Sequence, residues 1–172
     1  MSKELLSEAL KITSGIISIA PKQWLPPSEG SLSQSEMVIY KPLYIGTRGY
    51  IEKIANQVNG CYEKGWFDAC AVMIRRLLET LIIEVFESKG LESNIKKDGD
   101  YFYLRDMINV LLQEPLFNLG RNTKKALPKL KDIGDKSAHS RRFIAIRQDI
   151  DELKTDLRVV IQELLIISGI KK

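Results

Sequence analysis

The stretch "GDKSAHSRRF", residues 134–143, holds the residue types that best fit catalysis in this chain. His139 is the only histidine, and Arg141 and Arg142 follow it closely. An imidazole transfers protons near neutral pH, and a guanidinium binds phosphate through paired N–H donors. These types raise the question whether His139 is a catalytic base beside a phosphate-binding pair, Arg141 and Arg142. The alternative is that His139 is a structural imidazole, held between helices.

Other kinds of catalytic or ligand-binding site have no matching pattern in the sequence. Cys61 and Cys70 are nine residues apart and far from the histidine, which gives neither a CxxC pair nor enough ligands for zinc. "GTRG" at 46–49 lacks the lysine of a phosphate-binding P-loop. We therefore expect no metal, no cofactor and reduced cysteines in a cytoplasmic protein. No run of 18 apolar residues occurs, so no transmembrane helix and no membrane partner are predicted.

Positive charge is concentrated between residues 121 and 147. This block holds nine Lys or Arg residues against two Asp, whereas the whole chain has a net charge of only +4. Such a block on a mildly acidic body is typical of proteins that bind phosphate groups, RNA and DNA included. The predicted phosphate-binding residues are Arg121, Lys124, Lys125, Arg141 and Arg142. The alternative is an ordinary solvated basic face.

The elements that must position these residues are helices. Apolar residues from Ile51 to Tyr62 repeat at steps of three and four, and the segment from Trp66 to Gly90 is apolar on nearly every side. A third helix is predicted over about 101–113, and a short one after Pro128 that ends at Gly134. The last helix has inward positions at Ile146, Ile150, Leu153, Leu157, Val160 and Leu164. It either packs on the bundle, which we favour, or pairs with a second copy.

The chain divides into an N-terminal arm, residues 1–47, and a helical bundle domain, residues 48–172. Residues 1–10 can form a short amphipathic helix, and prolines with the Ser-rich stretch "SEGSLSQSE" make the rest of the arm irregular. Apolar residues are expected to tie this arm to the bundle: Trp24, Leu25, Val38, Ile39 and Tyr40. The fold class is therefore all-α, a helical bundle with an irregular Pro/Ser-rich arm.

Charges on the central helix need partners, because an unpaired buried charge costs several kcal/mol. Glu79 follows Arg75 by four residues and Arg76 by three, so either arginine can reach it along the helix. A structural polar network is predicted to hold the bundle together through Arg76, Glu79, Asp135 and His139.

Three segments in this order resemble a known family: "NQVNGCYEKGWFDACAVMIRRLLETLIIEVF", "LKDIGDKSAHSRRF" and "DIDELKTDLRVVIQELL". The chain resembles the bacterial domain-of-unknown-function family 4145, which is related to the HEPN helical domains. The resemblance covers about residues 48–168 and rests on Arg76 and Glu79 in the central helix, on "IGDKSAH" and on their order. It implies a HEPN-like helical bundle.

Catalytic HEPN domains are metal-independent ribonucleases, and their motif is an arginine, a polar residue, three further residues and a histidine, brought together from two chains. The arginine stabilises the charged transition state and the histidine assists proton transfer. Asp135 and His139 match the polar residue and the histidine, but Gly134 stands at the arginine position.

Three hypotheses follow. The favoured one is a non-catalytic, dimeric HEPN-like module that binds a partner or nucleic acid in a bacterial defence, mobile-element or stress context, as the resemblance implies. The second is an endoribonuclease that uses His139 with Arg141 or Arg142. The third is a protein-interaction module that dimerises through the heptad face and whose dimer breaks on Leu157→Asp.

Overall fold

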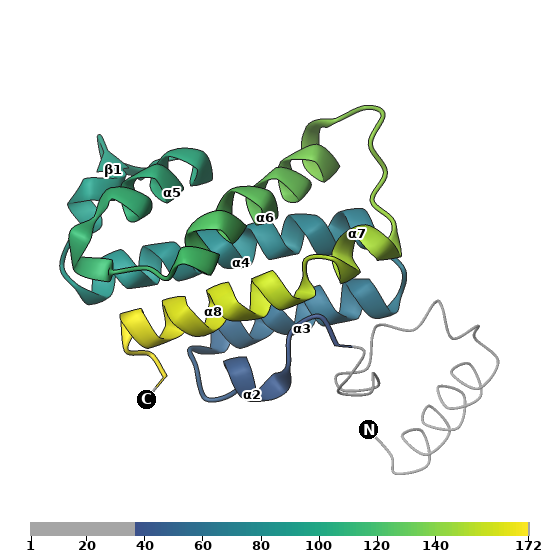
Figure 1. The fold of residues 1–172 in the computed structure, drawn as a ribbon, viewed down its shortest axis with the longest axis horizontal. Helices are drawn as coiled ribbons and strands as arrows, with labels where there is room; N and C mark the ends of the chain where they lie inside the picture. The colour runs from purple at the N-terminus through teal and green to yellow at the C-terminus, as the bar shows by residue number, and fades with distance from the viewer. Residues whose placement is uncertain (1–36, 172) are drawn as a thin grey trace, which may run out of the picture. The chain divides into compact units, whose positions relative to one another are not determined.

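The computed structural model describes residues 37–171, which form part of one compact unit (Figure 1). The predicted short helix at 1–10 and the arm residues Trp24 and Leu25 lie outside the described residues. The all-helical prediction is confirmed: within 37–171 the strands are limited to one two-stranded hairpin of two-residue strands. No helix in this range is long and apolar enough to cross a membrane.

Helices α3, Gly49–Glu63, and α4, Phe67–Ser88, form the antiparallel centre of the bundle (Figure 1). The apolar positions predicted from Ile51 to Tyr62 are buried on α3, as expected for one face of a helix. The turn between the two helices uses Gly65 at φ +75°, a left-handed conformation that glycine adopts without strain. Helix α4 packs against α3, α6 and α8, which explains why its sequence is apolar on nearly every side.

The segment 91–120 links α4 to α6. It contains a 3-10 turn η2, Glu92–Ile95, strands β1, Lys96–Lys97, and β2, Asp100–Tyr101, helix α5, Leu104–Gln113, and a 3-10 turn η3, Pro115–Phe117. The segment therefore holds a small hairpin, with Lys96 opposite Tyr101. Asp98 and Gly99 both have positive φ, as a two-residue hairpin turn requires. The predicted third helix is confirmed but begins at Leu104, not near residue 101.

Helix α6 runs without a break from Arg121 to His139. The prediction of a short helix that starts after Pro128 and ends at Gly134 was wrong, because both residues lie inside α6. A proline there removes one backbone hydrogen bond. Pro128 is exposed, so water can satisfy the Lys124 carbonyl that loses its partner. Burial of Leu127 and Leu130 beside the proline offsets the lost bond.

The last predicted helix is divided into α7, Arg147–Asp151, and α8, Lys154–Ser168. Four of its predicted inward positions are buried: Ile150, Leu157, Val160 and Leu164. Ile146 precedes α7 and is 56% exposed, so that part of the heptad prediction was wrong. Helix α8 packs on α4 and α6 of the same chain, which confirms the favoured arrangement.

Residues 37–44 pack against the bundle and include the short helix α2, Lys41–Tyr44. Val38 and Ile39 are fully buried, as expected for residues that tie the arm down. The Asn59 side chain accepts from Ile39 N and donates to Ile39 O, both at 2.9 Å. Arg158 of α8 donates to the Val38 carbonyl at 2.9 Å, and its guanidinium lies 3.7 Å from the centre of the Tyr40 ring. This segment is therefore held by side chains of α3 and α8.

Candidate functional site

The five predicted phosphate-binding residues are all exposed, and they lie at the two ends of α6. Arg121, Lys124 and Lys125, the N-terminal basic group, stand on its first two turns, and Arg141 and Arg142, the C-terminal basic group, follow its last residue. The 18 steps of the helix from Arg121 to His139 span about 27 Å at 1.5 Å per residue. The two groups therefore cannot bind one phosphate together, and each presents a separate contact.

The carboxylates of α6 are engaged by neighbouring cations. Asp132 pairs with Lys136 at 2.7 Å, and Asp135 pairs with Arg75 at 2.7 Å and with Lys131. Lys129, also in the basic block, lies 4.0 Å from Asp156 on α8. Within residues 37–171 no ion pair involves a member of either basic group. The exposed positive charge of α6 is therefore concentrated at its two ends.

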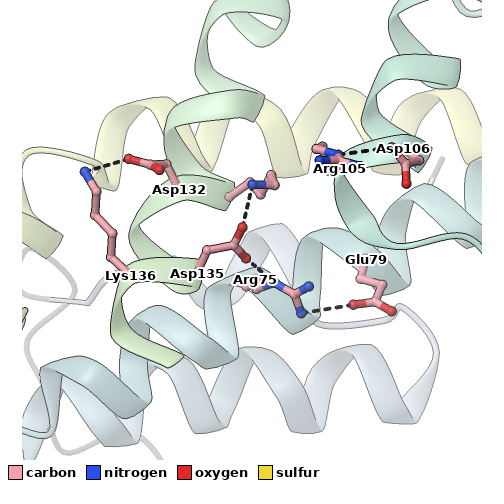
Figure 2. A network of polar contacts seen from close by, with 8 residues as sticks. Arg75, Glu79, Arg105, Asp106, Asp132, Asp135 and Lys136 are labelled. Atoms are coloured by element: carbon pink, nitrogen blue, oxygen red, sulfur yellow. Dashed lines mark hydrogen bonds and ion pairs between the residues drawn. The ribbon is translucent and has the colours of Figure 1, made fainter. Parts of the chain in front are cut away.

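The polar network that joins α4 to α6 is centred on Asp135 (Figure 2). Arg75 Nε donates to Asp135 Oδ1, and Arg75 Nη1 lies 3.5 Å from Glu79 Oε2. Lys131 donates to the other Asp135 oxygen from one turn earlier on α6. Burial raises the pKa of the Asp135 carboxyl, but the bonds from Lys131 and Arg75 outweigh burial and hold the pKa below its ordinary value.

Two members of the predicted network, Arg76 and His139, are not part of it. Arg76 is exposed because it lies about 100° further around α4 than Arg75, which faces α6. Glu79 and Asp135 are members as predicted. The sequence pattern allowed either arginine to reach Glu79, and only the packing of α6 on α4 selects Arg75.

His139 is exposed at the C-terminal end of α6, so the prediction of an imidazole held between helices was wrong. No hydrogen bond or ion pair is formed by its ring within the described part of the chain. The reason is the continuous α6 helix, which carries His139 beyond the last buried position, Gly134, and onto the outer face. The imidazole is thus accessible, one residue from Ser140 and two from Arg141.

Gly134 lies where α6 packs closely on α4. A Cβ atom at this position would be 2.6 Å from the Cβ of Arg75 and 3.0 Å from the carbonyl oxygen of Ala71. These distances are shorter than van der Waals contact, so only glycine fits without movement of α4. Residue 134 is thus buried, and a side chain there would point into α4.

Arg147 belongs to the basic block but has a structural role at the start of α7. Its guanidinium lies 4.7 Å from the centre of the Tyr62 ring and donates to the Tyr62 hydroxyl at 2.8 Å. That hydroxyl in turn donates to Asp151 at 2.6 Å, and Lys154 pairs with Asp151 at 2.7 Å. These contacts fasten α7 to α3. Arg147 therefore differs from the two basic groups, whose side chains extend into solvent.

Sequence reasoning missed an exposed apolar surface near the C-terminal basic group. Trp66 is 53% exposed, Ile144 77% and Ile146 56%, and we call these three residues the Trp66 patch. Ile144 and Ile146 are separated by one residue, which would have indicated an extended segment, but Ile146 was assigned to the last helix. Trp66 precedes α4, and only the fold brings the start of α4 to this segment, through the bond from Ala145 N–H to Asp68, so no local signal pointed to it.

Neither metal ligands nor known relatives give further information about the candidate site. Among residues 37–171 no group of three or more His, Cys, Asp or Glu side chains is placed to hold a metal ion. Burial raises the pKa of both cysteine thiols, and Cys70 donates to the Val58 carbonyl at 3.5 Å. Comparisons with family models, curated proteins and solved structures found no match.

Proposed function

We propose that this protein is a non-catalytic, HEPN-like bacterial module that binds RNA or DNA through the two basic groups of α6. The proposal rests on which charged side chains of α6 form ion pairs and which do not. Asp132 and Asp135 are each paired with cations of this chain, whereas the N-terminal and C-terminal basic groups extend into solvent without an ion pair among the described residues. Free guanidinium and ammonium groups bind phosphate oxygens and release counterions, which drives association with nucleic acid.

The spacing of the two basic groups sets the size of the proposed contact. Phosphates of one duplex strand are 3.4 Å apart along the axis, so a span of about 27 Å corresponds to about eight base pairs. Contacts of this kind go to the backbone and carry no base specificity. Binding is therefore expected to tolerate any sequence and to weaken steeply with salt.

Charge reversal tests this proposal. Two double variants, Arg121→Glu/Lys125→Glu and Arg141→Glu/Arg142→Glu, remove one basic group each. Affinity for a labelled RNA and a labelled DNA duplex is measured by fluorescence anisotropy over a range of salt. Each lost phosphate contact is expected to reduce the slope of log K against log salt by about 0.7–0.9. Lys53→Glu/Lys89→Glu is the matched control, because it changes net charge equally at exposed positions outside α6.

Loss of affinity in both α6 variants but not in the control is the expected result. The proposal is wrong if the wild type binds no nucleic acid at low salt. It is equally wrong if the control loses as much affinity as the α6 variants, because net charge alone would then explain binding.

The second candidate function is a metal-independent endoribonuclease, favoured by the exposure of His139 beside Arg141 and Arg142. Because the ring makes no contact that holds the described fold, His139→Ala should leave the melting temperature unchanged. RNA is incubated with the wild type and the variant in EDTA. Cleavage that disappears in His139→Ala establishes this activity, and no cleavage by the wild type rejects it. The resemblance implies that two chains complete such a site, so a homodimer in a defence or mobile-element setting is part of both candidates.

A further inference from the structure

The Trp66 patch consists of three exposed apolar side chains from two segments of the chain. Residues 143–146 lie outside any helix or strand, and the backbone of Ile146 is extended, with φ −113° and ψ 169°. In extended backbone alternate side chains share a face. Ile144 and Ile146 therefore point outward together, while Ala145 between them is 5% exposed. The result is two aliphatic side chains directed into solvent.

Trp66 lies at the same end of the bundle as the two isoleucines, because a hydrogen bond links the start of α4 to their segment. The backbone N–H of Ala145 donates to Asp68 at 2.9 Å, and Asp68 follows Trp66 by two residues. An extended chain advances at most about 3.6 Å per residue. The Cα atoms of Trp66, Ile144, Ile146 and Arg142 therefore each lie within about 11 Å of the Cα atom of Asp68 or of Ala145. Figure 1 shows the same arrangement: the 140–146 loop and the start of α4 lie at the α7 end, opposite α5.

Exposed cations flank the Trp66 patch on one side, because Arg141 and Arg142 precede Ile144 by three and two residues. Two carboxylates keep their negative charge there and bind the backbone of the isoleucine segment. Asp68 accepts from Ala145 N, and Asp149 accepts from Ile146 N at 2.8 Å. An apolar surface with an indole and two free guanidiniums is complementary to a ligand that carries both flat apolar rings and anionic groups.

We propose that the Trp66 patch is a docking surface for a single nucleic-acid strand, in which an unpaired base stacks on Trp66 and its neighbouring phosphates contact Arg141 and Arg142. The inference rests on the proposed function and adds its substrate class. A flexible single strand can contact both the Trp66 patch and the N-terminal basic group. A single strand is therefore favoured over a small ligand that can occupy the Trp66 patch alone. A duplex keeps its bases stacked inside and cannot offer one to Trp66, so the surface discriminates for single strands.

The test compares a labelled single-stranded RNA with the duplex of the same sequence. Stacking on an aromatic side chain changes affinity by roughly five- to 150-fold per base. Trp66→Ala is therefore expected to weaken single-strand binding by a factor in this range and to leave duplex binding unchanged. Trp66→Phe keeps an aromatic ring and is expected to recover most of the affinity. Tyr103→Ala is the matched control, because Tyr103 is 81% exposed and lies at the start of α5.

A spectroscopic measurement separates stacking from a structural role. The chain has two tryptophans, so in a Trp24→Phe background the emission reports Trp66 alone. Quenching on addition of single-stranded RNA, and none with duplex, supports the proposal. Melting temperatures of all variants are measured, and Trp66→Phe keeps the test valid if Trp66→Ala unfolds.

Three outcomes overturn this inference. If charge reversal in α6 abolishes binding while Trp66→Ala changes neither ligand, the proposed function stands and the stacking surface does not exist. If Trp66→Ala weakens single strand and duplex equally, strand discrimination is absent. If vesicles with anionic lipids quench Trp66 and single-stranded RNA does not, the surface binds membranes instead. Failure of the wild type to bind any nucleic acid marks failure of the proposed function itself.

Discussion

At the residue scale, Gly134 explains the most about this protein. It lies in a close contact between α6 and α4, with no room for a Cβ against Arg75 and Ala71. Packing therefore restricts residue 134 to glycine in this chain.

Gly134→Ala is expected to destabilise the fold despite the better helix propensity of alanine. Alanine gains about 1 kcal/mol of propensity, whereas overpacking at a close helix contact costs about 1–3 kcal/mol. We expect a net loss of about 1 kcal/mol or more in urea denaturation. Lys136→Ala, on the exposed side of the same helix, should change stability by no more than about 0.5 kcal/mol. An increase in stability with Gly134→Ala would show that α6 does not approach α4 this closely.

The lowered pKa of Asp135 predicts a pH dependence. A carboxyl whose folded pKa is below its unfolded value contributes stability above the unfolded pKa, and the contribution is lost as pH falls through the folded pKa. Asp135→Asn should therefore cost about 1–2 kcal/mol near neutral pH, the range for a half-exposed charged hydrogen bond. The difference from the wild type should shrink below about pH 4.

Urea denaturation of both proteins across a pH series measures this difference. Asp132→Asn serves for comparison, because its bond to Lys136 lies on the outer face and is more exposed. A difference between Asp135→Asn and the wild type that stays constant down to pH 2 would contradict the ionic role of Asp135.

At the element scale, α6 is the helix that connects packing to the proposed site. Its inner face is buried on α4 and α8, and its two ends carry the basic groups. Because the helix is rigid, it fixes the separation of those groups. Pro128 is the proline inside α6 and works against its continuity.

Pro128→Ala should stabilise the protein. The alanine restores the N–H that bonds to the Lys124 carbonyl and removes an interior proline penalty of about 3 kcal/mol. Part of this gain is offset because proline also restricts the unfolded chain. We expect a net increase of about 1–2 kcal/mol in the free energy of unfolding. A decrease would mean that a bend at Pro128 is needed to seat α6 on the bundle.

At the scale of the whole molecule, the heptad pattern of the last segment serves the core. Leu157 is fully buried by the bundle of its own chain, whereas Val159, two residues on, is 40% exposed. A dimer through the inward heptad positions would require this core to open.

Leu157→Asp is therefore expected to unfold the protein, and not merely to separate two copies. An unpaired carboxylate in a core position costs at least about 4 kcal/mol, a large part of the stability of a domain. Circular dichroism should show loss of helix, and Val159→Asp should keep the wild-type spectrum. A Leu157→Asp protein that stays helical but becomes monomeric in light scattering would show that this face joins two chains.

By itself, the sequence determined the helical class, the inward face of α3, the central place of α4, and the basic block around α6. These depend on periodicity and composition, which are local properties of the chain. Only the tertiary structure decided the choice of Arg75 over Arg76, the exposure of His139 and the bond that joins Ala145 to Asp68 at the start of α4. Each of these depends on how segments far apart in the sequence lie against one another. Because Leu127 and Leu130 are buried on either side of Pro128, α6 continues through the proline. The continuous helix places His139 at the surface and not in the expected interior.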